Sequence, residues 1–362
     1  MFRRRGRASG ALRVGTRLRQ DTEIVVVGAG VMGLATAAAL ARAGRSVVVL
    51  EQFGVDHDRG SSHGTVRIFK VSYPETEFVR LAQDSLARWR ELEAESGEEL
   101  LTTTGTLDVG GIAGRREALE RCGAAFEFVM AAEIERRFGL TIDGGGEALF
   151  QPDGGALHAD RARNVLASSL EVVAETAVAS LAPEREAVLL RTSAGEVRAR
   201  AVVVTVGAWV TKLLSPLGLQ PDVVAARETV AYFRLGDGRG STPLSEWRPE
   251  DREVFYAIVG RDGLLKVGVS GSGLPTDPDE HGRVDEDVVR RAADWARRRY
   301  ELRDDAPARA ETCLYTNAPD ERFVLERRGR IVVGSPCSGH GFKFAPVVGE
   351  RLAALALEAV AA

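Results

Sequence analysis

The pattern of hydrophobic and polar positions is clearest at residues 24–51, which read IVVVGAGVMGLATAAALARAGRSVVVLE. Four apolar residues at 24–27 predict a strand. After a glycine-rich turn, an Ala/Leu-rich segment predicts a helix, and residues 46–50 predict a second strand. The order strand, helix, strand is typical of a parallel sheet covered by helices.

Beyond this unit, helical and strand spacing alternate. Apolar positions separated by charges predict helices at 77–99, 131–138, 160–170 and 284–300, followed by an Ala/Leu-rich helix at the end of the chain. Asp160 is the predicted N-cap of the helix at 160–170. Short apolar runs between Gly, Pro and Asp turns predict strands at 101–111, 188–192, 196–200, 201–206, 227–233, 254–259, 264–269 and 331–333. The later strands have the spacing of an antiparallel sheet.

The turn after the first strand carries the spacing GxGxxG. Gly28 allows a tight turn, Gly30 lets backbone approach a pyrophosphate, and Gly33 lets the helix pack closely on the strand. The helix N-terminus offers unpaired N–H groups to phosphates, which places Val31 and Met32 beside them. Glu51 ends the second strand, where a carboxylate can accept hydrogen bonds from ribose hydroxyls. These residues predict a site for an ADP-containing dinucleotide.

We therefore predict an α/β fold (α+β overall) with two domains. A Rossmann-like dinucleotide-binding domain is assembled from discontinuous segments, residues 21–80, 155–217 and 321–362. A substrate domain with an antiparallel sheet takes residues 81–154 and 218–320. Residues 1–20 carry Arg and no acid, which predicts a disordered basic leader; a transit peptide or an overlong start are the alternatives. A small substrate is expected between the two domains.

Composition narrows the class of protein. The 362 residues are 44% hydrophobic and 28% charged, as in a globular enzyme, and the net charge of −4 predicts neither nucleic-acid binding nor membrane binding. No apolar run approaches the length of a membrane span. Three cysteines without metal spacing predict a reducing, cytoplasmic location without structural disulfides. For the oligomeric state we expect a monomer or a weak homo-oligomer.

Five further segments, in this order, resemble the monomeric sarcosine oxidase family. They are residues 59–70 (RGSSHGTVRIFK), 202–214 (VVVTVGAWVTKLL), 263–269 (GLLKVGV), 312–323 (TCLYTNAPDERF) and 334–344 (GSPCSGHGFKF). The family includes N-methyltryptophan oxidase and pipecolate oxidase and lies within the D-amino-acid oxidase superfamily. The resemblance runs from about Asp21 to the C-terminus.

The resemblance implies an FAD enzyme that oxidises the C–N bond of a secondary or cyclic amino acid. A hydride would pass to flavin N5, and O2 would then be reduced to H2O2. In the family, the cysteine of the CxYT motif is joined through sulfur to the flavin 8α-methyl. Here that residue is Cys313, with Tyr315 beside the cofactor; the alternative for Cys313 is a small buried thiol.

Lys266 lies among apolar neighbours in a predicted strand. The resemblance places its ammonium over flavin N5, where a fixed positive charge would stabilise superoxide during reoxidation. The alternative is a surface lysine.

Three cations are expected near the flavin and the substrate. Lys343 would hold the substrate carboxylate, with Lys70 as its counterpart. Relatives typically carry arginine at the position of Lys70, so a point charge replaces a bidentate fork; the alternatives are that the carboxylate is held differently, more loosely, or not at all. Arg67 matches the family arginine near the flavin. The alternative for each is a solvated surface charge.

The remaining expected residues surround these groups. Tyr256 would line the substrate pocket, where most tyrosines merely pack, and the small Cys337 would enlarge that pocket. His63 could contact FAD or be structural. The other predicted contacts of FAD are Gln52, Ser61, Ser62, Gly207, Trp209, Gly339, His340, Gly341 and Phe342.

The expected partners are an amine or amino-acid substrate and O2. A family member that desaturates a cyclic amine or imino acid is the first alternative, and the Lys70 departure favours it. A second is an FAD dehydrogenase that passes electrons to a carrier instead of O2; the presence of Lys266 argues against it.

Overall fold

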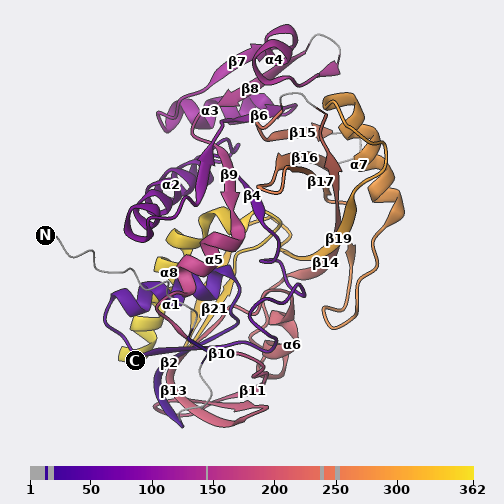
Figure 1. Ribbon diagram of the computed structural model, residues 1–362. Helices are drawn as coiled ribbons and strands as arrows, with labels where there is room; N and C mark the ends of the chain where they lie inside the picture. The colour runs from indigo at the N-terminus through magenta and orange to yellow at the C-terminus, as the bar shows by residue number, and fades with distance from the viewer. Residues whose placement is uncertain (1–12, 15–19, 144–145, 237–239, 249–252) are drawn as a thin grey trace, which may run out of the picture.

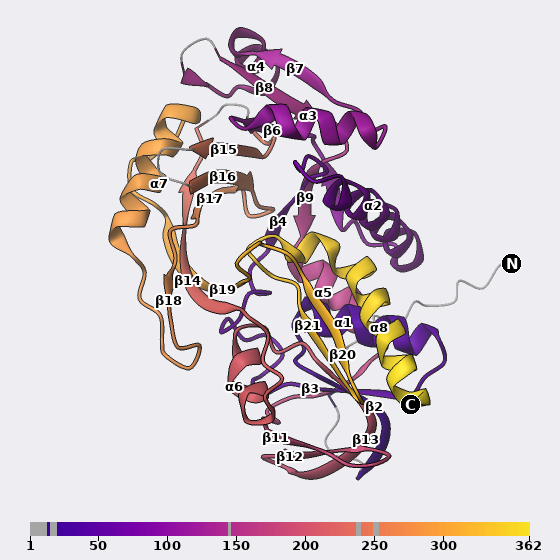
Figure 2. The ribbon, with the colours of Figure 1, turned by 180° about the vertical axis from the view of Figure 1, so that it is seen from behind.

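A computed structural model describes residues 13–14, 20–143, 146–236, 240–248 and 253–362. It contains a sheet of parallel and antiparallel strands at one end and a mostly antiparallel sheet at the other (Figures 1 and 2). A small sheet lies between them. The predicted fold class, α/β and α+β overall, is confirmed.

The first sheet has the strand order β1-β10-β3-β2-β13-β12-β11, with β21 also on β13 and β20 on β21. Its parallel part joins strands from distant parts of the chain: β1 (Arg13–Val14), β2 (Asp21–Val27), β3 (Val47–Leu50), β10 (Glu171–Val173), β13 (Gly195–Val204) and β21 (Ile331–Ser335). Its antiparallel strands are β11 (Val178–Pro183), β12 (Val188–Thr192) and β20 (Val324–Arg328).

Strand β2 explains why residues 24–27 are all apolar. Ile24 and Val26 pack into one hydrophobic core with the helices α1 (Val31–Arg42) and α8 (Ala345–Ala361). Val25 and Val27 pack into a second core on the opposite face of the sheet. Successive strand residues point to opposite faces, so a strand covered on both sides has to be apolar at every position.

The second sheet carries the cavity described below on one face. Its strands are β6 (Thr106–Val109), β7 (Glu127–Met130), β8 (Glu147–Gln151), β14 (Val224–Arg234), β15 (Leu244–Arg248), β16 (Glu253–Val259), β17 (Leu264–Ser270), β18 (Leu274–Pro275) and β19 (Arg309–Asn317). Helix α7 (Glu286–Arg299) covers the other face (Figure 1). Its Trp295 is buried in the core between the helix and the sheet. Asp285 caps this helix, accepting bonds from the N–H groups of Asp287 and Val288 at 2.9 and 3.2 Å.

A three-stranded sheet lies between the two larger ones. It is formed by β4 (Val66–Phe69), β9 (Gly155–His158) and β5 (Leu101–Thr103). The remaining helices are α2 (Thr76–Ser96), α3 (Ile112–Arg121), α4 (Ala131–Phe138), α5 (Ala159–Ala167) and α6 (Val210–Leu214). None of the helices among the described residues is long and apolar enough to cross a membrane.

Several details differ from the sequence-based expectations. The strands predicted at 196–200 and 201–206 are one continuous strand, β13. The strand predicted at 101–111 is two strands in different sheets, because Gly105 turns the chain with φ +71°. Asp160 is not the N-cap of α5: the helix begins one residue earlier, after His158, and no side chain caps it. Helix α3 was not predicted, because its 10 residues bury only Ala118 and Leu119 and so lack a strong apolar stripe.

Two predictions about chain organisation stay predictions. All three segments assigned to the dinucleotide-binding domain contribute strands to the first sheet, although the domain boundaries themselves are not tested. Of the predicted leader 1–20, most lies outside the described residues. Arg13 and Val14 form the short strand β1, which pairs with β10.

Candidate active site

A cavity of about 770 Å³ runs between the first and second sheets. We call its two parts the glycine end and the sheet end. The glycine end is lined by residues 27–32, 50–53 and 205–209, at the carboxyl ends of β2, β3 and β13. The sheet end is lined by Lys70, Tyr256, Lys266, Cys313 and Lys343. Clefts at the carboxyl ends of parallel strands are usual ligand sites in α/β proteins.

Two glycines of the motif are required by backbone packing. Gly28 has φ +100°, and a Cβ there would lie 2.6 Å from the carbonyl oxygen of Thr205. A Cβ on Gly33 would lie 1.9 Å from the carbonyl oxygen of Gly28. Gly33 is the only predicted site residue outside the cavity lining of the described structure; it shapes the loop from behind.

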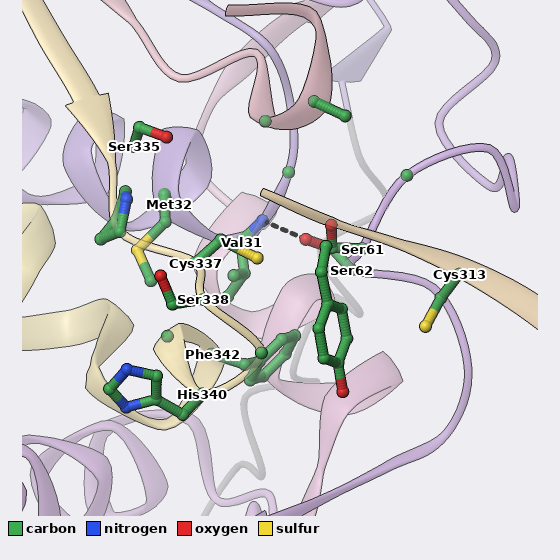
Figure 3. Close-up of a pocket in the computed structure, with 18 of the residues that line it drawn as sticks. Val31, Met32, Ser61, Ser62, Cys313, Ser335, Cys337, Ser338, His340 and Phe342 are labelled. Carbon is green, nitrogen blue, oxygen red and sulfur yellow. Dashed lines mark hydrogen bonds between the residues drawn. The ribbon is translucent and has the colours of Figure 1, made fainter. Parts of the chain in front are cut away.

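Glu51 is buried, with 5% exposure, and is held by backbone N–H groups. Its two carboxylate oxygens accept from Ala29 and Phe53 at 2.8 and 3.0 Å. At the start of α1, the N–H of Val31 donates to Ser62 Oγ at 3.0 Å (Figure 3). This end therefore combines helix N–H groups, a buried carboxylate and a hydroxyl, which fits the pyrophosphate and ribose of a dinucleotide such as FAD.

Arg163 on α5 also lines the glycine end, and the sequence analysis missed it. Its guanidinium donates to the carbonyl oxygen of Val55 at 2.6 Å, and its buried Nε lacks a partner. An Arg in an amphipathic helix gives no sequence signal that it faces a ligand. Trp209, which was predicted, lies in the cavity wall with its ring edge-on to Phe53 and its Nε1 bonded to Asp279 at 2.6 Å.

The side chain of Arg67 donates its hydrogen bonds to backbone carbonyl oxygens. It donates to the carbonyl oxygens of Ser61, His63 and Val66 at 2.8, 2.6 and 2.8 Å, and it lies over the ring of Phe342. No carboxylate lies within ion-pair distance of it among the described residues. His63 lines the cavity beside Arg67, and burial together with that charge lowers its pKa to about 4, which keeps the ring neutral.

Lys266 on β17 is buried, with 6% exposure. Its ammonium faces the ring of Tyr232, 5.8 Å from the centroid. Burial, and then the charge of Arg67, lowers the pKa of Lys266 to about 8. It is therefore a cavity-lining cation and not a surface lysine.

Cys313 on β19 lines the cavity, and Figure 3 shows its sulfur directed into the pocket. Burial raises the pKa of its thiol to about 11, while Lys266 and Arg67 oppose that shift. The nearby turn 339–341 is tightly packed: a Cβ on Gly339, which has φ +74°, would lie 2.4 Å from the ring of Tyr315, and one on Gly341 would lie 1.7 Å from the carbonyl oxygen of Pro336. The absence of a Cβ at these glycines lets the turn pack against Tyr315 and Pro336.

Lys343 and Lys70 approach the same tyrosine but have different partners. Lys343 donates to the hydroxyl of Tyr73 and to the carbonyl oxygen of His340, both at 2.9 Å. Burial, and then the charge of Lys70, lowers the pKa of Lys343 to about 7. Lys70 pairs with Asp108 at 2.9 Å, and its ammonium lies 5.7 Å from the centroid of the Tyr73 ring.

Asp108 was missed by the sequence analysis. It is 1% exposed and accepts hydrogen bonds from Lys70 and Ser72, with Arg115 Nε 3.8 Å away. These cations and bonds lower its pKa in spite of burial. An acid at an inward position of the strand TLDV is the signal that could have found it, since an unpaired carboxylate is rarely buried.

The other predicted residues also reach the cavity. Tyr256 and Tyr315 come from different strands, and their hydroxyls hydrogen-bond to each other. His340 bonds through Nε2 to the carbonyl oxygen of Glu321 at 3.1 Å, and burial lowers its pKa to about 3. Further lining residues from the prediction are Gly30, Met32, Gln52, Ser61, Gly207 and Cys337.

The comparisons with known proteins agree with this geometry. The sequence model of the DAO family, FAD dependent oxidoreductase, matches residues 23–355. The chain belongs to this family. The resemblance inferred from the five motifs is thereby confirmed, and FAD is the cofactor that the cavity fits.

Relatives cover nearly the whole chain. Peroxisomal sarcosine oxidase of Mus musculus is 31% identical, over 93% of this chain and 92% of the relative. Monomeric sarcosine oxidase of Streptomyces avermitilis is 32% identical, over 92% of this chain and 93% of the relative. The structure of NikD, an unusual amino acid oxidase essential for nikkomycin biosynthesis, superposes with a TM-score of 0.83 at 28% identity, covering 94% of this chain and 95% of that one.

Proposed function

We propose that this chain is an oxidase of secondary or cyclic amino acids, such as sarcosine, another N-methyl amino acid, or a pipecolate- or proline-like acid. The observation that carries the proposal is the set of three cavity-lining cations, the buried Lys266 and Lys343 and the half-buried Arg67, none of which has a carboxylate within ion-pair distance among the described residues. Buried charges are normally paired, so this arrangement fits a cavity whose anions arrive with ligands. FAD supplies the redox chemistry, accepting a hydride from the carbon beside nitrogen and delivering two electrons to O2.

Lys343 is proposed to bind the substrate carboxylate. Its ammonium bonds to a hydroxyl and a carbonyl oxygen, both neutral acceptors, and so keeps its charge available. Lys70 contributes less, because Asp108 already compensates its charge. No side chain is needed as a strong base, since an amine that binds in its neutral form can lose hydride directly.

Lys266 is proposed to stabilise the negative charge that develops on oxygen. A cation fixed in a buried site needs no reorganisation during the reaction, which is what makes such stabilisation effective. Its lowered pKa of about 8 still leaves it mostly protonated at neutral pH.

Cys313 is proposed to hold FAD covalently through its sulfur. Support comes from its direction into the cavity and from the two cations that favour its thiolate. We further propose that the protein acts in the cytoplasm as a monomer or weak homo-oligomer.

Two narrower functions are alternatives to the main one. A desaturase of a cyclic amine or imino acid is favoured by the Lys70–Asp108 pair, which weakens the hold on a carboxylate. In an FAD dehydrogenase that passes electrons to a carrier, Lys266 would have no reduced oxygen to stabilise.

The test uses purified protein with bound FAD. Anaerobic mixing with sarcosine, N-methyl amino acids, L-proline and L-pipecolate is expected to bleach the flavin absorbance, and air is expected to restore it with one H2O2 for each imine formed. Failure of every carboxylated amine to bleach the flavin would overturn the proposal. Bleaching that air does not reverse, but an artificial acceptor does, would favour the dehydrogenase. Complete release of flavin by acid would overturn the covalent bond alone.

A further inference from the structure

Glu228 is a buried acid that the proposed reaction does not use. It lies on β14 with 3% exposure, directly opposite Cys313 on the antiparallel neighbour β19. Directly opposite residues point to the same face of a sheet, with Cβ atoms about 4.5–5.5 Å apart. Glu228 therefore shares the cavity face of the second sheet with Cys313, although it does not line the open space.

The polar partners of Glu228 are neutral. Its Oε2 accepts from Ser272 Oγ at 3.2 Å, and the N–H groups of Gly271 and Gly273 also donate to the carboxylate. A Cβ on Gly273 would lie 2.7 Å from the carboxylate carbon, so a glycine makes room for it. No cation lies within ion-pair distance of Glu228 among the described residues.

Two tyrosines close the same region. Tyr256 extends from β16 over Gly268, where a Cβ would lie 2.4 Å from its hydroxyl oxygen. It meets the hydroxyl of Tyr315 on β19, and in the strand order β17 and β14 lie between β16 and β19. The pair therefore crosses over β14, the strand of Glu228, and helps to keep water from the carboxylate.

This environment suits a proton acceptor. Burial raises the pKa of Glu228 to about 7, so near neutral pH it exchanges protons readily. Cys313 needs a proton acceptor. Its thiol must lose a proton to act as a nucleophile, and burial raises the pKa of that thiol to about 11.

We propose that Glu228 is the base that takes the thiol proton of Cys313 when its sulfur becomes joined to FAD. The proposal rests on the covalent attachment proposed above. In this step the S–H bond of Cys313 and one C–H bond of the flavin 8α-methyl break, and a C–S bond forms. The two electrons remain on the flavin until O2 takes them up with the two protons as H2O2. Glu228 thus serves maturation of the holoenzyme and has no part in turnover.

The test follows attachment itself. Full-length apoprotein, made without flavin, is mixed with FAD, and samples are denatured at intervals and assayed for in-gel flavin fluorescence. At pH 7, Glu228→Gln is expected to slow attachment about 100-fold, the size of a general-base contribution. Gln keeps the shape and an acceptor oxygen, so thermal stability and initial FAD binding are expected to stay near wild type.

The pH profile separates a base from a structural residue. Below the pKa of Cys313 the thiolate fraction rises tenfold per pH unit, so the Glu228→Gln deficit is expected to shrink from pH 7 to pH 10. The other groups that interact with the pair are Arg67, Lys266, Cys337, Tyr256, Tyr315 and Glu253. They are the same in both proteins, so the ratio of rates at each pH isolates Glu228.

Ser272→Ala is the matched control, because it removes a donor to Glu228 and leaves the carboxylate. It is expected to attach FAD within a few-fold of the wild-type rate. Wild-type attachment by Glu228→Gln at pH 7, or a deficit equal at every pH, would overturn the inference while leaving covalent attachment intact. A wild-type protein that never retains flavin on the gel would overturn the attachment and the inference together.

Discussion

The glycine end and the sheet end of the cavity are built from different parts of the chain and from different chemical groups. At the glycine end, the ligand space meets backbone N–H groups, with Glu51 held by the N–H groups of Ala29 and Phe53. At the sheet end it meets the side chains of Lys266, Cys313 and Lys343, from segments far apart in sequence. The first arrangement depends on backbone geometry, and the second on single side chains. Substitutions should therefore act differently at the two ends.

The largest effect is expected at the sheet end. Lys266→Met removes the cation but keeps an apolar stem, and reoxidation of the reduced flavin by O2 should slow about 10²–10³-fold. Stopped-flow mixing of the anaerobically reduced protein with O2 measures this step apart from substrate oxidation. Lys212→Met is the control, since that lysine lies at the other end and pairs with Asp277 and Asp279. Reoxidation of Lys266→Met at the wild-type rate would remove the proposed role.

At the glycine end, a backbone change should matter more than loss of a side chain. Gly33→Ala places a Cβ 1.9 Å from the carbonyl oxygen of Gly28, so the loop must shift. We expect about 1–3 kcal/mol of destabilisation and a matching loss of FAD affinity. Thermal unfolding and FAD titration measure the two effects. Gly54→Ala, where a Cβ meets nothing within 4 Å, should be neutral. Equal behaviour of the two variants would contradict the packing argument.

The charge of Lys343 should make anion binding at the sheet end depend on pH. Its pKa of about 7 in the ligand-free protein means that it is protonated below pH 7 and loses its charge above it. Affinity for an unreactive carboxylate such as propionate should therefore be level below about pH 7 and fall up to tenfold per unit above it. Perturbation of the flavin spectrum measures binding. Lys343→Met should bind weakly at every pH; an unchanged slope in that variant would assign the titration to another group.

The smallest effect is expected for a side chain at the glycine end. Ser62→Ala removes the hydroxyl that accepts from the N–H of Val31, but leaves the N–H itself. The free energy of FAD binding should weaken by no more than the net value of one hydrogen bond, about 0.5–1.5 kcal/mol. Equilibrium dialysis of FAD against a Cys313→Ser background, which prevents attachment, gives the affinity. A loss as large as that of Gly33→Ala would mean that this end also depends on individual side chains.

The glycine end was easier to predict from the sequence than the sheet end. At the glycine end, the two strands, the glycine loop and Glu51 lie in one continuous stretch, residues 24–51, and these elements were predicted from local spacing. The residues of this end that the sequence analysis missed come from other parts of the chain, such as Arg163 on α5. At the sheet end, resemblance to a family located Lys266, Cys313 and Lys343, which the structure gathers in the same cavity. Spacing alone gave no reason to bring them together.

The partner of Lys70 is a contact that the sequence pattern could not predict. The sequence marked Lys70 as a departure, but its consequence depends on Asp108, whose Oδ1 lies 2.9 Å from Lys70 Nζ. Lys70 follows β4 of the small sheet, whereas Asp108 is on β6 of the second sheet. Glu228 is a second case, because only the β14–β19 register places it opposite Cys313. Long-range pairing of strands decides both contacts, and no local propensity encodes it.

The sequence by itself determined the mixed α/β class, the dinucleotide loop and the family, because these depend on local periodicity and on motifs within short segments. Tertiary structure alone decided which charges are compensated. Lys70 is paired, whereas Lys266, Lys343 and Arg67 have no carboxylate within ion-pair distance among the described residues. The physical reason is that the charge state and reach of a buried group are set by neighbours in space, through burial and Coulomb interaction, and those neighbours come from distant parts of the chain.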